Sequence, residues 1–339
     1  MTVRVGINGF GRIGRNFVRA ALEQRADIEV VAVNDLTSPV TLAHLLEYDS
    51  TQGHLEAPVA AEGDDIVVGD ARLMVLAERE PSALPWGDLG VEVVLESTGR
   101  FTARGDAAAH LKGGATRVVI SAPSKDADAT FVVGVNTDTF DPELHQVVSN
   151  ASCTTNCFVP MVKVLDDAFG VVTGLMTTVH AYTNDQNLLD LQHHDLRRAR
   201  AAAVNIVPAS TGAARATGLV LSAMKGRLDG TGLRVPVPVG SITDFTAVLQ
   251  RAVDVDEVNR AFAAAAEAGP LAPVLAYSEA PLVSSDIVGS PASCTFDAPL
   301  TMVQAIDGST TLVKAFGWYD NEWGYSNRLV DLVSILGGR

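Results

Sequence analysis

The sequence predicts a two-domain α/β protein: a parallel sheet covered by helices on both faces, then an α+β domain with an antiparallel or mixed sheet. Three observations support this fold class. A strand at 3–8, a glycine turn and a helix with apolar residues from Ile13 to Leu22 follow one another, and a second strand at 28–34 completes a β-α-β unit. Short β-rich runs then alternate with helical segments up to residue 150, as in parallel sheets. Beyond residue 150 the strands are longer and alternate apolar with polar residues, as in antiparallel sheets.

The remaining elements follow from apolar periodicity. Short strands are predicted in the first half at 66–68, 73–76, 91–96, 117–121, 131–135 and 147–149. Longer strands are predicted in the second half at 171–181, 233–250 and 300–318, and helices at 152–169, 211–223, 255–268 and 324–336. The polar segment 182–205 has no regular apolar period and no Gly/Ser or Pro-rich tract. We therefore expect it to form an extended functional loop instead of a linker.

Length and composition limit the possible functions. A chain of 339 residues is expected to form two domains, with one large domain as the alternative. The net charge of -15 argues against binding to nucleic acids or anionic membranes. Three cysteines do not make a disulfide framework, no signal peptide precedes the strand that begins at Val3, and no apolar run approaches the ~20 residues of a membrane span. We expect a soluble, cytoplasmic protein.

Residues 150–156, Asn-Ala-Ser-Cys-Thr-Thr-Asn, carry the strongest chemical signal. Polar capping residues run into an apolar stretch, which predicts a helix N-terminus and places Cys153 in its first turn. Unpaired backbone N–H groups and roughly half a positive charge at that end favour a thiolate, which makes Cys153 the candidate nucleophile. An ordinary buried cysteine is the alternative, and Cys157 is interpreted as packing. No nearby cluster completes a ligand shell around the two sulfurs, so no metal site is predicted.

A glycine motif, Gly9-Phe-Gly-Arg-Ile-Gly14, lies between the first strand and the first helix. Gly9, Gly11 and Gly14 permit a tight turn, close approach of the backbone to a pyrophosphate, and tight helix–strand packing. Asp35 closes the second strand, where a carboxylate accepts from the ribose hydroxyls of NAD and repels the extra phosphate of NADP. Thr98 and Ser121 follow later strands, at the sheet edge where ligands bind. A structural turn is the alternative for each of them.

His180 ends a strand 27 residues after Cys153, which favours a Cys–His pair over a satisfied core histidine. Thr183, Thr211, Gly212 and Arg234 supply hydroxyl, backbone and guanidinium donors, which are the components of anion sites. Simpler interpretations stay open, because Thr211 and Gly212 also suit a helix cap and Arg234 also suits a surface cation.

Taken together, these segments resemble the glyceraldehyde-3-phosphate dehydrogenase family over nearly the whole chain. The resemblance rests on residues 6–15, 33–36, 48–51, 149–157, 177–183, 195–202, 234–238 and 318–326. It implies a Rossmann NAD-binding domain at 1–151, joined by a C-terminal helix at 319–339, and a catalytic domain at 152–318. It also implies a homotetramer in which the 182–205 loop lies against the neighbouring subunit's cofactor site.

The resemblance assigns further site residues and a reaction. Contacts to NAD are expected at Arg12, Ile13, Asp35, Arg79, Ser121 and Asn321. Two anion pockets are expected to contain Ser152, Thr154, Thr183, Arg198, Thr211, Gly212 and Arg234. Cys153 as nucleophile and His180 as base would oxidise glyceraldehyde 3-phosphate, and inorganic phosphate would release 1,3-bisphosphoglycerate in glycolysis. The alternatives are an erythrose-4-phosphate dehydrogenase of the same superfamily, a Cys–His hydrolase, and a catalytically silent binding protein.

Overall fold

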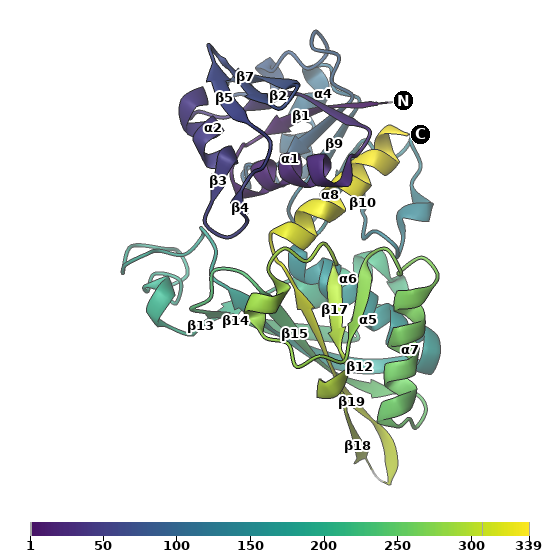
Figure 1. Cartoon of the computed structure of the whole chain (residues 1–339). Helices are drawn as coiled ribbons and strands as arrows, with labels where there is room; N and C mark the ends of the chain where they lie inside the picture. Colours follow the sequence, from purple (N-terminus) through teal and green to yellow (C-terminus); the bar gives the residue numbers. More distant parts are fainter. Residues whose placement is uncertain (1, 307, 339) are drawn as a thin grey trace. The chain divides into compact units, whose positions relative to one another are not determined.

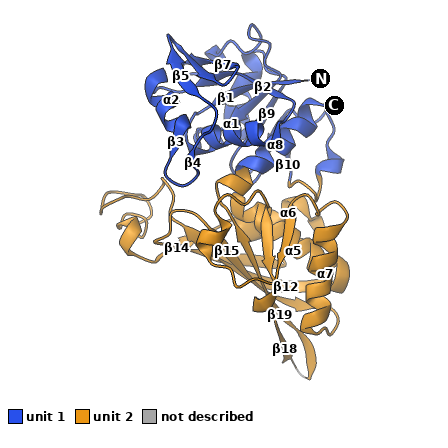
Figure 2. Ribbon diagram, in the orientation of Figure 1, with its two compact units in different colours: residues 1–131, 137–152, 326–339 blue, residues 132–136, 153–325 orange. Residues whose placement is uncertain are grey.

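The computed structural model describes residues 2–306 and 308–338, and the chain divides into two compact units (Figure 2). The first unit contains Met1–Phe131, Thr137–Ser152 and Ser326–Arg339, and the second contains Val132–Asn136 and Cys153–Tyr325. Residues 132–136 and 319–325 therefore belong to the second unit, whereas the expected boundaries assigned them to the first, and Ser152 belongs to the first unit instead of the second.

The sheet of the first unit is mainly parallel (Figure 1). Its strands run in the order β10 (Ala129–Thr130), β11 (Val147–Ser149), β9 (Arg117–Ile120), β8 (Val93–Glu96), β1 (Val3–Asn8), β2 (Ile28–Asn34), β7 (Ala71–Leu76), β6 (Asp65–Val68) and β5 (Val59–Glu62). Neighbours pair in parallel from β10 to β7, and β6 and β5 add an antiparallel edge. This confirms the predicted sheet type.

Helices and short elements complete the first unit. They are α1 (Arg12–Gln24), α2 (Pro39–Glu47), α3 (Arg104–Ala107), α4 (Ala109–Lys112), the two-stranded pair β3 (Tyr48–Asp49) and β4 (Gly53–His54), and most of α8 (Trp323–Gly337). The glycine motif forms the turn between β1 and α1. A Cβ on Gly9, which has a φ of +91°, would lie 2.6 Å from the Thr98 nitrogen, and a Cβ on Gly14 would lie 2.5 Å from the Gly9 oxygen. These two positions therefore require glycine.

The sheet of the second unit is mixed. Its strands run in the order β13 (Val207–Ser210), β14 (Leu228–Val235), β12 (Val171–Ala181), β15 (Ser241–Leu249), β19 (Ser309–Tyr319), β17 (Cys294–Asp297) and β16 (Leu275–Ser278), with β18 (Met302–Ile306) paired to β19. The β12–β14 and β16–β17 pairs are parallel, and the others are antiparallel. Helix α5 (Cys153–Phe169) contacts β12, β15, β17 and β19 and packs against α6 (Ala213–Val220) and α7 (Val255–Glu267). These contacts bury a continuous apolar core between the helices and the sheet.

Three strand predictions are wrong in detail. The predicted strand 233–250 covers the end of β14 and the whole of β15, which are separate strands. The predicted strand 300–318 covers β18 and β19, which pair with each other in antiparallel fashion. Residues 131–135 are not a strand: Gly134 has a φ of +81°, and the Val135 N–H donates to the Val132 carbonyl at 3.0 Å in a turn. The 182–205 segment is irregular apart from a short 3-10 turn at Ala202–Val204, as predicted. Among the described residues, no helix combines the length and apolarity needed to cross a membrane.

Candidate active site

Cys153 is the first residue of α5, as the capping pattern predicted. The preceding Ala151 has a φ of 55°, in the left-handed region that residues with a Cβ rarely adopt. Such a conformation costs of order 1–3 kcal/mol and is found where the surrounding structure imposes it. The thiol is half-buried, and its Sγ lies 3.4 Å from Nε2 of His180. The structure therefore brings together the two predicted catalytic residues.

His180 is buried at the end of β12, and its two ring nitrogens have different partners. Nδ1 lies 2.7 Å from the Ala181 carbonyl oxygen, which can only accept a hydrogen bond. This contact is shorter than the 3.2 Å between Nδ1 and the Arg234 guanidinium, whose N–H groups have Ala181 and Thr183 as acceptors, so we assign the proton to Nδ1. The unprotonated Nε2 then points its lone pair at Cys153. The chain thus supplies a base within hydrogen-bond reach of the candidate nucleophile.

Burial favours the neutral form of both groups of this pair. Burial raises the pKa of the Cys153 thiol to about 11, and the charge of Arg234 and the Thr154 N–H offset only part of that rise. Burial and the charge of Arg234 together lower the pKa of His180 to about 3. The helix terminus was expected to favour a thiolate, but desolvation is the larger effect here. The geometry instead suits proton transfer from Sγ to Nε2 as the sulfur reacts.

Arg234 connects this pair to an anion-binding group of side chains. The register of the parallel β12–β14 pair sets His180 opposite Arg234. One guanidinium nitrogen of Arg234 lies 3.2 Å from Nδ1 of His180, and it donates to the Ala181 carbonyl at 3.1 Å and to Oγ1 of Thr183 at 2.8 Å. Thr183 donates in turn to Asp185, and Arg198 forms an ion pair with the same carboxylate.

Asp185 was not predicted as a site residue, although it belongs to the polar loop that the sequence marked. Burial raises its pKa, but Thr183, Arg234 and Arg198 outweigh that effect and hold the pKa below the usual range. The carboxylate therefore stays ionised beside two guanidinium groups. Arg198 is linked to the Cys153–His180 pair only indirectly. The contacts run from Arg198 to Asp185, then to Thr183 and Arg234.

Tyr319 is the second residue that the sequence reasoning missed, because its motif was recognised without a role for the tyrosine. Its buried hydroxyl lies 2.9 Å from Oγ1 of Thr154 and 2.7 Å from Oγ1 of Thr178. Its ring meets the His180 ring edge-on, with centroids 5.9 Å apart. The Thr154 side chain, predicted to bind an anion, is thus engaged with Tyr319. The Tyr319 hydroxyl thus connects the start of α5, through Thr154, to the last part of β12, through Thr178.

The other predicted anion-site residues lie at helix starts. Ser152 immediately precedes α5, while Thr211 and Gly212 separate β13 from α6. Oγ1 of Thr211 accepts from the Ala213 N–H at 3.2 Å, so this hydroxyl contributes to the cap of α6. Asn321, predicted to contact NAD, is buried in the second unit and accepts from the Ser241 hydroxyl at 2.9 Å.

In the first unit, several predicted cofactor residues line one cavity of about 580 Å³. The lining includes Gly9, Gly11, Asp35, Arg79 and Thr98, together with Asn8, Asn34, Leu36, Glu78, Glu80, Ser97, Arg100 and Phe101. A Cβ on Gly11 would meet nothing within 4 Å, and no side chain caps the helix that Gly11 precedes. The N–H groups at the start of α1 are therefore accessible to an anion. This arrangement fits a dinucleotide with its pyrophosphate at the helix start.

Asp35 has the placement that ribose recognition requires. Its two carboxylate oxygens accept from the Phe10 and Thr37 N–H groups, each at 3.0 Å, which fixes the side chain at the cavity. Gly14, Ile13, Arg12 and Ser121 are not among the residues that line this cavity. Gly14 instead packs α1 on β1, and the Ser121 N–H bonds the Glu96 carbonyl at 2.9 Å.

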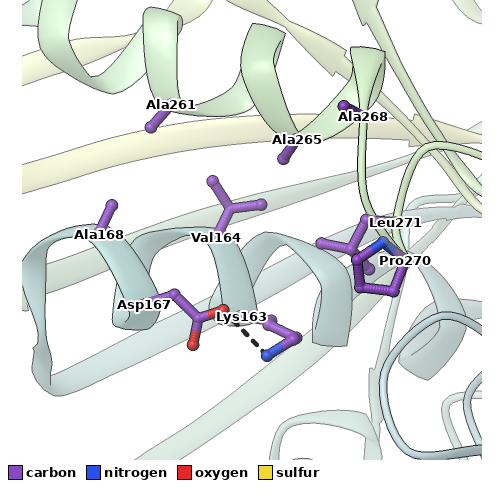
Figure 3. A pocket seen from close by; sticks show the side chains of 9 residues that line it. All are labelled: Lys163, Val164, Asp167, Ala168, Ala261, Ala265, Ala268, Pro270 and Leu271. Carbon is purple, nitrogen blue, oxygen red and sulfur yellow. Dashed lines mark hydrogen bonds and ion pairs between the residues drawn. The ribbon is translucent and has the colours of Figure 1, made fainter.

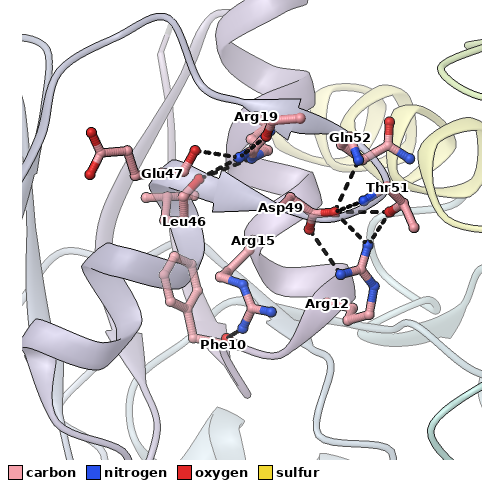
Figure 4. A network of polar contacts seen from close by, with 10 residues as sticks. Phe10, Arg12, Arg15, Arg19, Leu46, Glu47, Asp49, Thr51 and Gln52 are labelled. Carbon is pink, nitrogen blue, oxygen red and sulfur yellow. Dashed lines mark hydrogen bonds and ion pairs between the residues drawn. The ribbon is translucent and has the colours of Figure 1, made fainter.

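The Arg12 side chain faces a different group of residues (Figure 4). It makes a two-pronged ion pair with Asp49, at 2.9 and 3.0 Å, and donates to Thr51 at 2.6 Å. Burial raises the pKa of Asp49, but hydrogen bonds from Arg12, Gln52 and Thr51 outweigh it and hold the pKa well below its usual range. The guanidinium thus anchors the 49–52 turn.

Three further observations concern parts of the molecule outside this cavity. Within the described residues, no group of three His, Cys, Asp or Glu side chains is arranged to hold a metal ion. A hollow between α5 and α7 contains none of the predicted site residues, and its charged side chains, Lys163 and Asp167, pair with each other at 2.9 Å (Figure 3). Phe158 is fully buried against Phe245 and belongs to the core.

Comparison with known proteins adds an independent line of support. Residues 3–104 match the family model described as glyceraldehyde 3-phosphate dehydrogenase, NAD binding domain, and residues 152–321 match its C-terminal domain. Glyceraldehyde-3-phosphate dehydrogenase of Streptomyces coelicolor is 62% identical to this chain over 339 residues. The alignment covers 100% of both chains. The enzyme of Mycobacterium tuberculosis is 62% identical over 343 residues, with 99% of each chain covered. A second protein of that name from Streptomyces avermitilis is 60% identical over 339 residues, with 100% of each chain covered.

These matches extend over both compact units and include the segments that form the Cys153–His180 pair and the glycine-rich cavity. The matched N-terminal model names NAD as the bound molecule, and the cavity that contains Asp35 suits it. NAD is therefore the cofactor, and the chain is an NAD-dependent oxidoreductase that belongs to the glyceraldehyde-3-phosphate dehydrogenase family.

Proposed function

We propose that this protein catalyses the NAD-dependent oxidative phosphorylation of D-glyceraldehyde 3-phosphate to 1,3-bisphosphoglycerate, the glycolytic reaction. The observation that carries the proposal is the contact of 3.4 Å between Cys153 Sγ and His180 Nε2, next to Arg234, in a chain of this family. A nucleophile, a base and a cation are needed together for covalent chemistry on a phosphorylated aldehyde.

In the proposed mechanism, Cys153 attacks the aldehyde carbon while Nε2 of His180 accepts the thiol proton. The imidazolium returns this proton to the carbonyl oxygen, which gives a hemithioacetal. The neutral imidazole then takes the proton of the new hydroxyl as the carbon is oxidised. NAD, when bound, supplies the hydride acceptor. The acyl group is then held on Cys153 as a thioester, which conserves the free energy of oxidation. Attack by inorganic phosphate releases the acyl phosphate and frees the thiolate, which His180 reprotonates.

The two phosphate groups require local positive potential in a protein of net charge -15. Arg234 and Thr183 are already joined by a hydrogen bond of 2.8 Å beside His180, and Arg198 adds a second guanidinium through Asp185. The helix starts at Ser152–Thr154 and at Thr211–Gly212 offer hydroxyl and backbone donors. We assign these two groups of residues to the substrate phosphate and to inorganic phosphate, without assigning which group serves which.

A steady-state assay with and without inorganic phosphate tests this function directly. With glyceraldehyde 3-phosphate and NAD, formation of NADH should depend on phosphate, and the product should be an acyl phosphate that hydroxylamine traps as a hydroxamate. Erythrose 4-phosphate should be a poor substrate. Comparable turnover of erythrose 4-phosphate with no need for phosphate would contradict the proposal and favour the other dehydrogenase of the superfamily.

We also propose that the protein works as a homotetramer in the cytoplasm. The 182–205 segment exposes Leu188 (81%), Leu189 (75%), Leu191 (64%), Leu196 (81%) and Val204 (76%). An exposed apolar group of this size is typical of an interface, and a second copy of the chain is the partner we assign to it. The three cysteines are free thiols, which a reducing compartment preserves. Sedimentation equilibrium measures the oligomeric state, and a monomer at micromolar concentration would contradict it.

Arg234→Ala should weaken the use of the phosphorylated aldehyde far more than that of an unphosphorylated one. Loss of a charge-assisted contact to phosphate costs about 1.5–3 kcal/mol, or about 10- to 150-fold in kcat/KM. The measurement is kcat/KM for glyceraldehyde 3-phosphate and for glyceraldehyde. Equal losses on both substrates would show that Arg234 acts instead through His180 or Thr183, the two side chains that it contacts.

Asp35→Gly should reduce the preference for NAD over NADP, chiefly because the variant binds NAD more weakly. The wild type should favour NAD by about a hundredfold or more, because the NADP phosphate would place about two negative charges beside this carboxylate. Leu36, Thr37 and Ser38, which follow Asp35, provide no cation to offset them. The measurement is the ratio of kcat/KM values for the two cofactors. Equal use of both by the wild type would mean that Asp35 does not set the preference.

A further inference from the structure

A chain of buried polar side chains lies behind the cofactor cavity of the first unit, and none of the predicted roles accounts for it. Its centre is Glu96, the last residue of β8, which is 2% exposed and is not among the residues that line the cavity. A carboxylate at this depth needs donors on both oxygens to offset its desolvation. The structure supplies them from three residues, Asn8, His110 and Thr98.

The proton positions around Glu96 follow from Trp86. The Trp86 indole N–H, which can only donate, lies 3.0 Å from Nδ1 of the fully buried His110. Nδ1 must therefore accept, and the single imidazole proton is on Nε2. Nε2 lies 3.1 Å from Oε2 of Glu96 and donates to it. The contact with Trp86 thus makes His110 a neutral hydrogen-bond donor. Oε2 of Glu96 accepts from His110 and Asn8, and Oε1 accepts from Thr98.

The same oxygen of Glu96 fixes the orientation of two buried amides in succession. Asn8 donates from Nδ2 to Oε2 of Glu96 at 2.6 Å, which turns its Oδ1 toward Asn34. Asn34 donates from Nδ2 to Oδ1 of Asn8 at 2.7 Å and to the Glu78 carbonyl at 2.8 Å, and its Oδ1 accepts from the Glu78 N–H at 2.8 Å. The directions of the hydrogen bonds from Asn8 and Asn34 therefore both depend on Glu96 accepting from Asn8.

Both ends of this chain reach the lining of the cofactor cavity. On one side, Asn34 holds the backbone of Glu78, immediately before the exposed Arg79. On the other side, Oε1 of Glu96 accepts from the N–H of Thr98 at 2.8 Å and from its hydroxyl. Asn8, Asn34, Glu78, Arg79 and Thr98 all line the cavity, so a change at Glu96 is transmitted to two of its walls.

We infer that Glu96 is a positioning residue for NAD, which sets the Arg79 segment and Thr98 at the cavity through oriented hydrogen bonds. The inference rests on the proposed placement of NAD in this cavity. Glu96 contacts neither the reacting atoms nor the Cys153–His180 pair in this arrangement. Its effect should therefore appear in the affinity for NAD and not in the chemical step.

Glu96→Gln tests the inference with almost no change in shape. A glutamine presents one acceptor and one donor, so either the Asn8 and His110 donors or the Thr98 N–H must lose their acceptor. The dissociation constant of NAD, measured by isothermal titration calorimetry, and the KM for NAD should rise about tenfold or more, with kcat at saturating NAD unchanged within about threefold. Glu92→Gln is the matched control, because Glu92 is exposed just before the same strand. It should bind NAD as the wild type does.

A second variant keeps the inference testable if Glu96→Gln fails to fold. Asn34→Asp retains the acceptor for the Glu78 N–H but sets a carboxylate oxygen against two acceptors, the Asn8 Oδ1 and the Glu78 carbonyl. It should weaken NAD binding by about tenfold or more for the same reason. Unchanged NAD affinity in either folded variant, or a fall in kcat without a rise in KM, would overturn the inference. A wild type that binds NAD in the calorimeter but fails the assay with glyceraldehyde 3-phosphate would refute the proposed function alone.

Discussion

Cys153→Ser should abolish dehydrogenase activity, with a loss of several orders of magnitude in kcat. A serine hydroxyl is a much weaker nucleophile than a thiol, and a neutral imidazole at 3.4 Å cannot make up the difference. The ester that serine would form also lacks the reactivity of a thioester toward phosphate. The measurement is the rate of NADH formation at saturating substrate, together with the amount of acyl-enzyme trapped when phosphate is omitted.

Cys157→Ser is the matched control, since it makes the same change one helical turn away. Cys157 is fully buried in the core, its thiol contacts the Gly317 carbonyl at 3.5 Å, and it makes no contact with His180. Most of the activity should therefore survive, with a modest cost in stability. Near-normal turnover by Cys153→Ser, or a comparable loss in both variants, would contradict the assignment of Cys153 as nucleophile.

The local elements of this site were predictable because their signals are local. The start of α5 follows from a polar cap and an apolar period within one segment, and the bounds of β12 follow from one continuous run. The errors in strand prediction come from turns within apolar sequence. Gly240, with a φ of +89°, separates β14 from β15, and Gly134 turns the chain where a strand was expected.

The pairing of the site residues is long-range, and only the fold provides it. His180 and Arg234 are 54 residues apart in the sequence, and the parallel register of β12 with β14 makes them neighbours. Asp185 and Tyr319 lie within segments that the sequence marked as functional. Their contacts with Thr183 and Thr154 depend on loop geometry and on a strand end that no spacing rule describes.

The protonation state of Cys153 was the least predictable feature, because two effects of opposite sign compete. A helix N-terminus favours a nearby negative charge by about 0.3–1 kcal/mol. Burial has the opposite sign and the larger effect, because it raises the pKa of the thiol to about 11 even with Arg234 and the Thr154 N–H opposing it. The sequence shows the helix start but not the amount of protein around the sulfur. In the mechanism that we propose, the thiol therefore needs a base, and His180 has the larger part in its activation.

His180→Asn should slow turnover by about 10²- to 10⁴-fold, the usual contribution of a general base. The same change should alter how the reactivity of Cys153 depends on pH. In the wild type, burial and Arg234 lower the pKa of His180 to about 3, so Nε2 is unprotonated at neutral pH and available to take the thiol proton as the sulfur reacts. In the variant, the proton must leave to solvent. The rate of alkylation by iodoacetamide should then rise about tenfold per pH unit until the pH approaches the thiol pKa of about 11.

The comparison of the two pH profiles separates the base from a merely structural histidine. The wild type should keep substantial alkylation well below pH 11, because thiolate and imidazolium 3.4 Å apart attract each other and offset part of the cost of burying both charges. Cys153→Ser identifies the reactive sulfur, since Cys157 and Cys294 are buried and should react slowly. If His180→Asn leaves the pH profile of alkylation unchanged while turnover falls, the histidine acts only after the thiol has lost its proton. In that case Arg234, whose charge lowers the thiol pKa, would be the residue that activates Cys153.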